Sequence, residues 1–318
     1  MSARKRESVE RSPGSDSRMT YTEFLRRFKD DDACRAYLKE RFYPDGTPCP
    51  KCEQPSKFHR ISGRSAYSCQ LCGHHVYPTA GTIFHKSSTS LQLWFWAIYL
   101  IASSKCGISA KQLGREIGVT YKTAWRMLKQ IRLLLGQDGG PLSGDVEVDE
   151  TFMSGRMRAS DRKKRDQAGI QKNTPAYHLK GKMVVAAVER HGRVRASVAA
   201  DRTKPTLHAK IREFVLPESM IFTDEWALYG GIGREYKGHK RVRHKARIYV
   251  EDDAGTQNVE SFFALFKNSV RGAHHNVSAK YLPHYLDEYT FRWNHRKDER
   301  PIFWTILERA RKDRLVGA

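Results

Sequence analysis

The first half of the chain carries apolar residues at helical spacing. Residues 19 to 44 show a period that predicts two short helices, which end at the turn signal Pro44-Asp45-Gly46. The stretch from 91 to 102 (LQLWFWAIYLIA) is almost wholly apolar and predicts a buried helix. A further helical period runs from 108 to 135. This half is therefore expected to be mainly helical.

The second half has a different pattern, and the breaker Gln137-Asp138-Gly139-Gly140-Pro141 marks the boundary. Alternation over 146–152 (VEVDETF) predicts a strand, and 180–189 and 194–200 predict two more. The remaining predicted elements are a helix over 207–215, a strand over 220–224 and a helix over 258–269. Strands followed by mixed elements predict an α/β or α+β domain.

Charge narrows the class of partner. The 57 Lys and Arg exceed the 35 Asp and Glu, which gives a formal net charge of +22 over 318 residues. Such an excess favours a polyanion, most often nucleic acid. With 39% hydrophobic residues the chain can build real cores, which excludes a mainly disordered protein. The apolar run is shorter than the roughly 17–25 residues of a membrane helix, and no secretory signal precedes it. We therefore expect no membrane association and a cytoplasmic, nucleoid-associated protein.

Four of the six cysteines form two CxxC pairs. Cys49 and Cys52 are separated from Cys69 and Cys72 by the sixteen residues from 53 to 68. In a reducing compartment this spacing indicates metal chemistry rather than disulfides. Four thiolates fill a tetrahedral shell and leave no open position, so the pattern predicts a structural Zn²⁺ site.

Residues 108 to 128 have the pattern of a helix-turn-helix. The first helix is expected to end at Gly118, the second to begin after Thr120 as its cap, and the small Gly114 to permit close approach. The alternative is an αα-hairpin that serves only for packing. The residues expected to contact the major groove or phosphates are Tyr121, Lys122, Trp125, Arg126 and Lys129.

Three acids stand at the ends of structured segments, where a buried charge needs a reason. They are Asp149 in the first predicted strand, Asp224 at the end of an apolar strand and Glu260 near the start of a helix. Lys267 lies about two helical turns beyond Glu260 on the same face. Converging carboxylates suit two Mg²⁺ or Mn²⁺ ions, which can activate a hydroxyl and stabilise the leaving oxygen of a phosphodiester.

Neighbouring acids can replace one of these three if the register is misjudged. They are Asp145, Glu147, Glu150 and Glu225. Glu147 shares the strand face of Asp149 by period two, so it is either a supporting acid or a rival ligand.

These segments combine into a recognisable series: CPKC, CQLC, GTIF, GISAKQLGREIGVTYKTAWRML, VEVDET, TDEWALY, NVESFFALFKNSVRG and YLDEYTFRWNHR. Over about residues 19 to 300 the series closely resembles bacterial insertion-sequence transposases of the ISXO2-like group, relatives of the eukaryotic Merlin elements. The resemblance implies a multidomain α/β protein. An amino-terminal zinc ribbon and helix-turn-helix region would precede an RNase H-like mixed β-sheet flanked by helices.

The resemblance also implies a DDE transposase that binds terminal inverted repeats, cuts DNA and transfers the 3′-OH strand. It implies that Asp149, Asp224 and Glu260 hold two Mg²⁺ or Mn²⁺ ions and that Lys267 positions a phosphate. Relatives often read N-T-I-E or N-T-V-E here, so Asn258 and Gln257 remain alternatives for the third member. Glu260 is the preferred third member, because a charged carboxylate oxygen binds a hard cation better than an amide oxygen does. The basic stretch 156–172 is either a DNA-contacting loop or a disordered insertion, and its candidate DNA contacts are Arg156, Arg158, Lys163, Lys164 and Arg165.

The expected organisation is a disordered tail (1–18), a short helical segment (19–44), the four-cysteine zinc ribbon (45–80), the helix-turn-helix region (85–137), the catalytic domain (144–300) and a helical tail (301–318). The expected partner is DNA, as transposon ends and as target, and the family implies a homodimer or larger synaptic assembly. Two other functions stay open: an RNase H-like nuclease or resolvase that does not join strands, and a DNA-binding regulator derived from a transposase.

Overall fold

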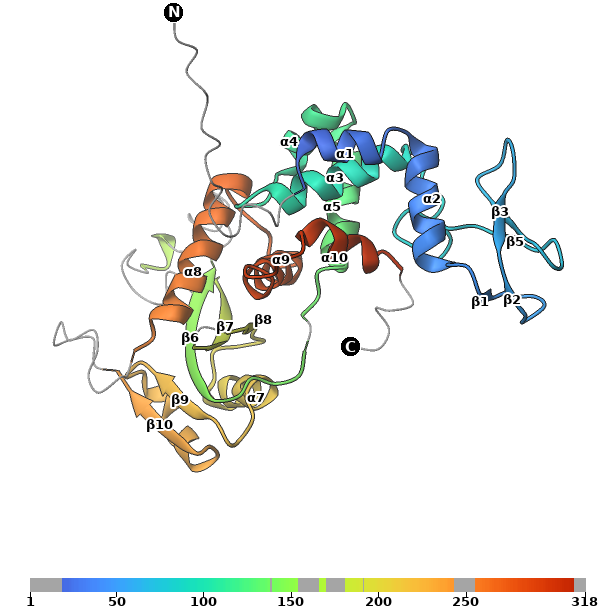
Figure 1. Cartoon of the computed structure of the whole chain (residues 1–318). Coiled ribbons are helices and arrows are strands. Elements are labelled where there is room, and N and C mark those ends of the chain that lie inside the picture. Colours follow the sequence, from blue (N-terminus) through green and yellow to red (C-terminus); the bar gives the residue numbers. More distant parts are fainter. Residues whose placement is uncertain are drawn as a thin grey trace, which may run out of the picture. The chain divides into compact units, whose positions relative to one another are not determined.

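The computed structural model describes residues 19–137, 139–153, 166–169, 181–190, 192–242 and 255–311. The chain divides into two compact units, one formed by Met1–Leu134 with Lys297–Ala318 and the other by Leu135–Arg296 (Figure 1). Among the described residues, every helix is too short or too polar to span a bilayer.

The first unit has an aromatic core that joins distant parts of the chain. The centre of the Phe28 ring lies 4.9 Å from that of Phe95 and 5.7 Å from that of Phe303. The carboxy-terminal helix therefore packs with the first helices. The helices of this unit are α1 (Tyr21–Arg27), α2 (Asp31–Phe42), α3 (Leu91–Ser103), α4 (Ala110–Ile117), α5 (Tyr121–Leu133) and α10 (Ile302–Glu308).

Short strands lie between α2 and α3. β1 (Thr47–Pro48) pairs antiparallel with β2 (Pro55–Ser56), and β3 (Phe58–Arg60), β4 (Tyr67–Cys69) and β5 (His75–Val76) form an antiparallel sheet in that order. Phe58, Tyr67 and Val76 are buried there together with Cys49 and Cys69. With so few apolar side chains, this region has little core of its own and depends on its cysteines.

The second unit is built on a five-stranded mixed sheet with the order β10-β9-β6-β7-β8. Its strands are β6 (Asp145–Met153), β7 (Lys182–Glu189), β8 (Val194–Val198), β9 (Met220–Thr223) and β10 (Gly238–Arg241). β7 is antiparallel to both β6 and β8, whereas β9 is parallel to β6 and β10 is parallel to β9. This order and these directions are those of the RNase H-like fold.

Helices cover both faces of this sheet, and β6 and β7 alternate their side chains between the two cores. α7 (Lys204–Phe214) packs on one face, where Val146, Val148 and Val185 point. α8 (Gln257–Ser269) and α9 (Leu282–Asn294) pack on the other, over Val184 and Ala186. β7 reads as a near-continuous apolar run because both of its faces are buried.

The outer edge of β8 is closed by two side-chain amides. Gln137 accepts a hydrogen bond from the Ala196 amide at 3.0 Å and donates to the Ala196 carbonyl. Asn294 accepts from the Val194 amide at 2.7 Å and donates to the Val194 carbonyl at 3.1 Å. Each amide thus takes the place of a neighbouring strand.

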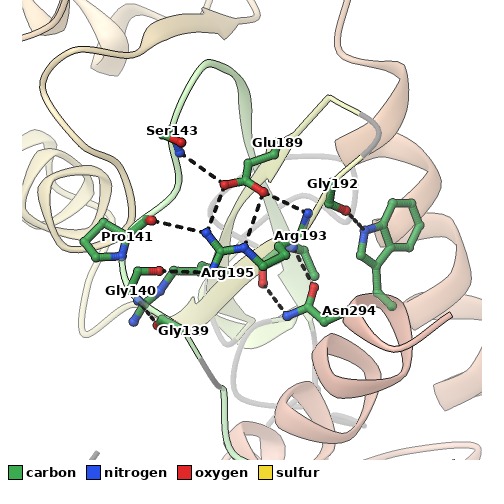
Figure 2. Close-up of polar contacts among 11 residues, drawn as sticks. Gly139, Gly140, Pro141, Ser143, Glu189, Gly192, Arg193, Arg195 and Asn294 are labelled. Carbon is green, nitrogen blue, oxygen red and sulfur yellow. Dashed lines mark hydrogen bonds and ion pairs between the residues drawn. The ribbon is translucent and has the colours of Figure 1, made fainter. Parts of the chain in front are cut away.

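Beside this edge, the turn between β7 and β8 is fixed by charge (Figure 2). Glu189 accepts hydrogen bonds from the guanidinium of Arg193 at 3.0 Å and from the Ser143 amide at 3.2 Å. Burial raises the pKa of Glu189, but the bonds from Arg193 outweigh it and hold the pKa below its usual value. The turn is thereby tied to the segment that leads into β6.

The elements predicted for the second half are present, but one of them begins earlier, and α9 and β10 are not among the predicted elements. The helix predicted over 207–215 begins earlier, at Lys204, because Thr203 caps it and Pro205 fits its first turn. The pattern does not predict β10, since Gly238–Arg241 has no apolar alternation. β10 is an edge strand whose pairing with β9 supplies its stability.

Candidate metal centre, DNA-binding helix and active site

The four predicted cysteines converge in the first unit. Cys49 Sγ lies 3.7 Å from Cys72 Sγ, Cys52 Sγ lies 4.0 Å from Cys69 Sγ, and all four sulfur atoms lie within 4.8 Å of one another. A tetrahedral Zn²⁺ site with bonds of about 2.3 Å has sulfur–sulfur edges of about 3.8 Å. The sulfur positions therefore fit one Zn²⁺ ion held by four thiolates.

The two CxxC turns have the same backbone design. Glu53 N donates to Cys49 O at 2.9 Å, and Gly73 N donates to Cys69 O at 3.0 Å. Both residues after the second cysteine are left-handed, with φ 57° for Glu53 and 67° for Gly73. Ser56 Oγ lies 3.1 Å from Cys69 Sγ, and this hydroxyl lowers the pKa of Cys69 to about 6. A lowered pKa favours the thiolate that a metal needs.

The helix-turn-helix forms as predicted from its local signals. α4 ends at Gly118, which is left-handed at φ 69°, and Thr120 caps α5 by accepting from Thr123 N at 3.3 Å. A Cβ on Gly114 would lie 2.9 Å from Val119 O, so only glycine allows this approach of the turn to α4.

The predicted DNA contacts lie on the outer side of α5. Tyr121 is 60% exposed, Lys122 and Arg126 are exposed, and Trp125 and Lys129 are partly exposed. Lys129 Nζ lies 5.6 Å from the centre of the Trp125 ring. The opposite side of α5 is buried in the core, so these five residues lie on the accessible side of the helix. The loop candidates Arg156, Arg158, Lys163, Lys164 and Arg165 lie outside the described residues.

The sheet brings two of the predicted acids together. Asp149 lies on β6, and Asp224 directly follows β9, which is the parallel neighbour of β6. The last pair in the register is Glu147 with Phe222, and continuing it by two residues along each strand brings Asp149 level with Asp224. Asp149 lies in the middle of β6 and Asp224 directly follows β9, so the two acids are on neighbouring strands.

Glu260 and Lys267 approach from α8. Asp149 is paired with Ala186, whose side chain lies in the core under α8, so Asp149 and α8 share one face of the sheet. Burial and the negative charges of Asp224 and Glu260 raise the pKa of Asp149 to about 6. The positive charge of Lys267 opposes this rise. Asp149 therefore interacts electrostatically with each of the other three predicted groups.

Each acid has one oxygen held by a nearby donor. Asp149 accepts from Glu150 N at 2.8 Å, Asp224 accepts from Trp226 N at 3.0 Å, and Glu260 accepts from Thr256 Oγ1 at 2.8 Å. These bonds orient the carboxylates, and carboxylate oxygens are the donors that Mg²⁺ and Mn²⁺ prefer. The donor set thus fits divalent cations. Within the described part of the chain, however, only the cysteines bring three or more ligand atoms within 4.8 Å, and uncompensated carboxylates repel one another.

The two acids that flank Asp149 are bound elsewhere. Glu150 points to the other face of the sheet, where its carboxylate accepts a hydrogen bond from the Tyr229 hydroxyl. Tyr229 belongs to the short helix η1 (Ala227–Tyr229), just beyond Asp224. Burial raises the pKa of Glu150 to about 8. Glu147 is 2% exposed and binds the start of α8. Period two gives the face of each acid, but the partners come from distant segments that the sequence pattern does not identify.

Comparison with known proteins agrees with these observations. Residues 141–294 match the ISXO2-like transposase domain, and residues 29–75 match the transposase zinc-ribbon domain. The protein is therefore a transposase with a DDE-type catalytic domain and a zinc ribbon.

The chain is also similar to a protein of a transposable element and, weakly, to a solved structure. Over 298 residues the chain is 25% identical to the uncharacterized protein in transposable element ISH50 of Halobacterium salinarum, with 90% of this chain and 99% of that protein covered. The structure of the simian T-cell lymphotropic virus intasome with PP2A regulatory subunit B56 gamma aligns at a TM-score of 0.32 with 14% identity, over 64% of this chain and 74% of that one. A similarity this low adds nothing to the strand order. The chain belongs to the ISXO2-like transposases.

Proposed function

We propose that this transposase binds the terminal inverted repeats of its insertion sequence, cleaves the DNA there and joins the freed 3′-OH to target DNA. The observation that carries the proposal is the match of residues 141–294, which include Asp149, Asp224, Glu260 and Lys267, to the ISXO2-like transposase domain. Negative charges gathered at one end of a sheet suit bound divalent cations. The net positive charge of the protein attracts DNA, whose phosphodiester groups can then reach such a site.

In this proposal Asp149 and Asp224 hold the cations and Glu260 completes the set of ligands. Two bound Mg²⁺ or Mn²⁺ ions supply activation of the attacking hydroxyl and charge stabilisation of the leaving oxygen. Lys267 holds a DNA phosphate by its positive charge, and its Nζ lies 5.8 Å from the centre of the Phe263 ring. Water is the nucleophile in the cleavage step and the 3′-OH in the joining step, so the protein itself forms no bond to DNA.

DNA-end recognition is assigned to α5. Its exposed Tyr121, Lys122 and Arg126 would read the major groove or bind phosphates, with Trp125 and Lys129 beside them. The four-cysteine ribbon would hold a structural Zn²⁺ in the same unit. Because two transposon ends have to react together, we expect the enzyme to act as a homodimer or larger assembly.

The test is a strand-transfer assay on DNA carrying the inverted repeats that flank the reading frame, with Mg²⁺ or Mn²⁺. Asp149→Ala and Asp224→Ala should each abolish cleavage and joining while DNA binding, measured by fluorescence anisotropy, stays within about twofold. Glu225→Ala is the matched control, since Glu225 is exposed and adjacent to Asp224. It should keep both activities.

The outcomes separate the three functions. Cleavage without a joined product would indicate a nuclease, and DNA binding without cleavage in either metal would indicate a regulator. Full activity in either aspartate variant would refute the assignment of the site.

A further inference from the structure

The start of α8 is held by a carboxylate from the sheet. Glu147 Oε2 accepts hydrogen bonds from Asn258 N at 2.7 Å and from Val259 N at 3.1 Å. Glu147 Oε1 accepts a third bond, from Asn258 Nδ2 at 2.9 Å. Arg190 Nε lies 3.4 Å from the same oxygen. Glu147 is thus a buried carboxylate, with 2% of its surface exposed, and four donor atoms from three residues surround it.

This contact replaces the usual helix cap. Thr256 stands at the N-cap of α8, but its hydroxyl makes no capping bond and donates to Glu260 instead. The first amides of a helix have no partner within the helix, and its amino terminus favours negative charge. Glu147 supplies both the acceptor and the charge from a residue 111 positions earlier in the chain.

The contact also fixes the position of Glu260 relative to Asp149. Glu147 is two residues before Asp149 on the same face of β6. Val259, which it binds, is one residue before Glu260 on α8. A carboxylate at one end and two backbone amides at the other leave α8 little freedom to slide along β6. One buried contact therefore sets how Asp149 on β6 and Glu260 on α8 are positioned along each other.

We propose that Glu147 is a positioning residue that aligns Glu260 with Asp149 for shared metal binding, and that Asn258 is part of this clamp. The proposal rests on the proposed function above. It removes Glu147 as a rival metal ligand, because its two oxygens are already occupied by α8 and Arg190. It likewise gives Asn258 a structural partner and leaves Glu260 as the third acidic member.

The first experiment measures cleavage by full-length Glu147→Gln as a function of Mn²⁺ concentration. Loss of a group that orients a metal ligand typically weakens metal affinity about 10- to 100-fold, so half-maximal cleavage should need about 10- to 100-fold more Mn²⁺. DNA affinity should remain within about twofold. Asp145→Asn is the matched control. Asp145 lies on the same strand face, but it is exposed, and its contact with Arg190, at 3.9 Å, is longer than that of Glu147. It should keep the wild-type metal requirement.

A second readout does not depend on activity. Hydrogen exchange at Asn258 N and Val259 N should become at least about 10-fold faster in Glu147→Gln, since each bond to a charged group contributes about 1.5–3 kcal/mol. Mn²⁺ binding measured by calorimetry should weaken in parallel with the cleavage curve. If wild-type protein cleaves no DNA in either metal, the proposed function fails, whereas exchange and Mn²⁺ binding still decide the clamp.

Two further variants keep the test decisive if Glu147→Gln does not fold. Glu147→Asp keeps the charge but shortens the side chain, and Asn258→Ala removes only the bond at 2.9 Å. Both should raise the Mn²⁺ requirement, and combining them should give less than the product of the two effects, because they act on one contact.

Three results would overturn the proposal. One is an unchanged Mn²⁺ requirement in every folded variant of Glu147 and Asn258. Another is unchanged exchange at the first amides of α8. The third is complete loss of cleavage at all Mn²⁺ concentrations in Glu147→Gln while Glu260→Gln stays active, since Glu147 would then be a ligand itself.

Discussion

Replacing Glu150 with glutamine should remove a pH-dependent destabilisation of the second unit in the metal-free protein. Burial raises the pKa of Glu150 to about 8, whereas an unfolded glutamate titrates near 4.5. Between these two pH values the folded state binds a proton that the unfolded state has released. Stability therefore falls as the pH rises from about 4.5 to about 8 and is constant above that range.

The size of the effect follows from the same two values. Each unit of pKa difference corresponds to about 1.4 kcal/mol, so the gap sets a ceiling of about 5 kcal/mol above pH 8. Glutamine has the same shape, carries no charge and can still accept a bond from Tyr229. The variant should therefore show almost none of the loss.

Hydrogen exchange of peptides from β6 and β7 can measure this in full-length protein without added metal. After correction for intrinsic rates, the opening free energy of the wild type should fall by about 1.4 kcal/mol per pH unit between pH 6.5 and 8 at most. Asp149→Asn is the control. The pKa of Asp149 is raised only to about 6, and its charge adds less than burial to the pKa of Glu150, so its removal should reduce the fall above pH 6.5 without abolishing it. An equally steep fall in Glu150→Gln would refute a protonated Glu150.

Three further predictions concern the first unit. Removing Zn²⁺ with a chelator, or Cys72→Ser, should expose residues 45–80 to rapid hydrogen exchange while peptides from β6 stay protected. Glu53→Gly should raise the thermal midpoint of the ribbon, because a left-handed non-glycine residue costs about 1 kcal/mol of stability. Gly73→Ala should lower the midpoint by a similar amount, and equal midpoints in these variants and the wild type would contradict the backbone argument. Gly114→Ala should destabilise the helix-turn-helix by about 1–3 kcal/mol in urea unfolding, since its Cβ would meet a backbone oxygen, and weaken DNA binding by α5; a stabilised variant would contradict the close approach.

The parts of the fold that could be predicted from the sequence are those with local signals. The CxxC pairs, the Gly118 turn and the Thr120 cap all lie within a few residues of the structure they form, and the structure has them as predicted. Asp149 and Asp224 are predicted as acids at the ends of structured segments; this is correct for Asp224, which directly follows β9, but Asp149 lies in the middle of β6. The register between β6 and β9 then set the two side by side.

What the sequence could not show depends on contacts between distant segments. Glu147 and Glu150 look alike in an alternating strand, yet one binds α8 and the other binds Tyr229. No spacing rule predicts that a helix will be capped by a residue 111 positions away. In the same way, the segment predicted as a helical tail contains α10, whose Phe303 packs against Phe28.

The closed edge of β8 restricts how two copies of the enzyme can associate. A sheet normally grows when a new strand pairs with an exposed edge, and many homodimers form a continuous sheet in this way. At Val194 and Ala196 the groups that a partner strand would need are already used by Asn294 and Gln137. If two copies of this transposase associate, their sheets cannot join at these positions, and the contact has to use other surfaces.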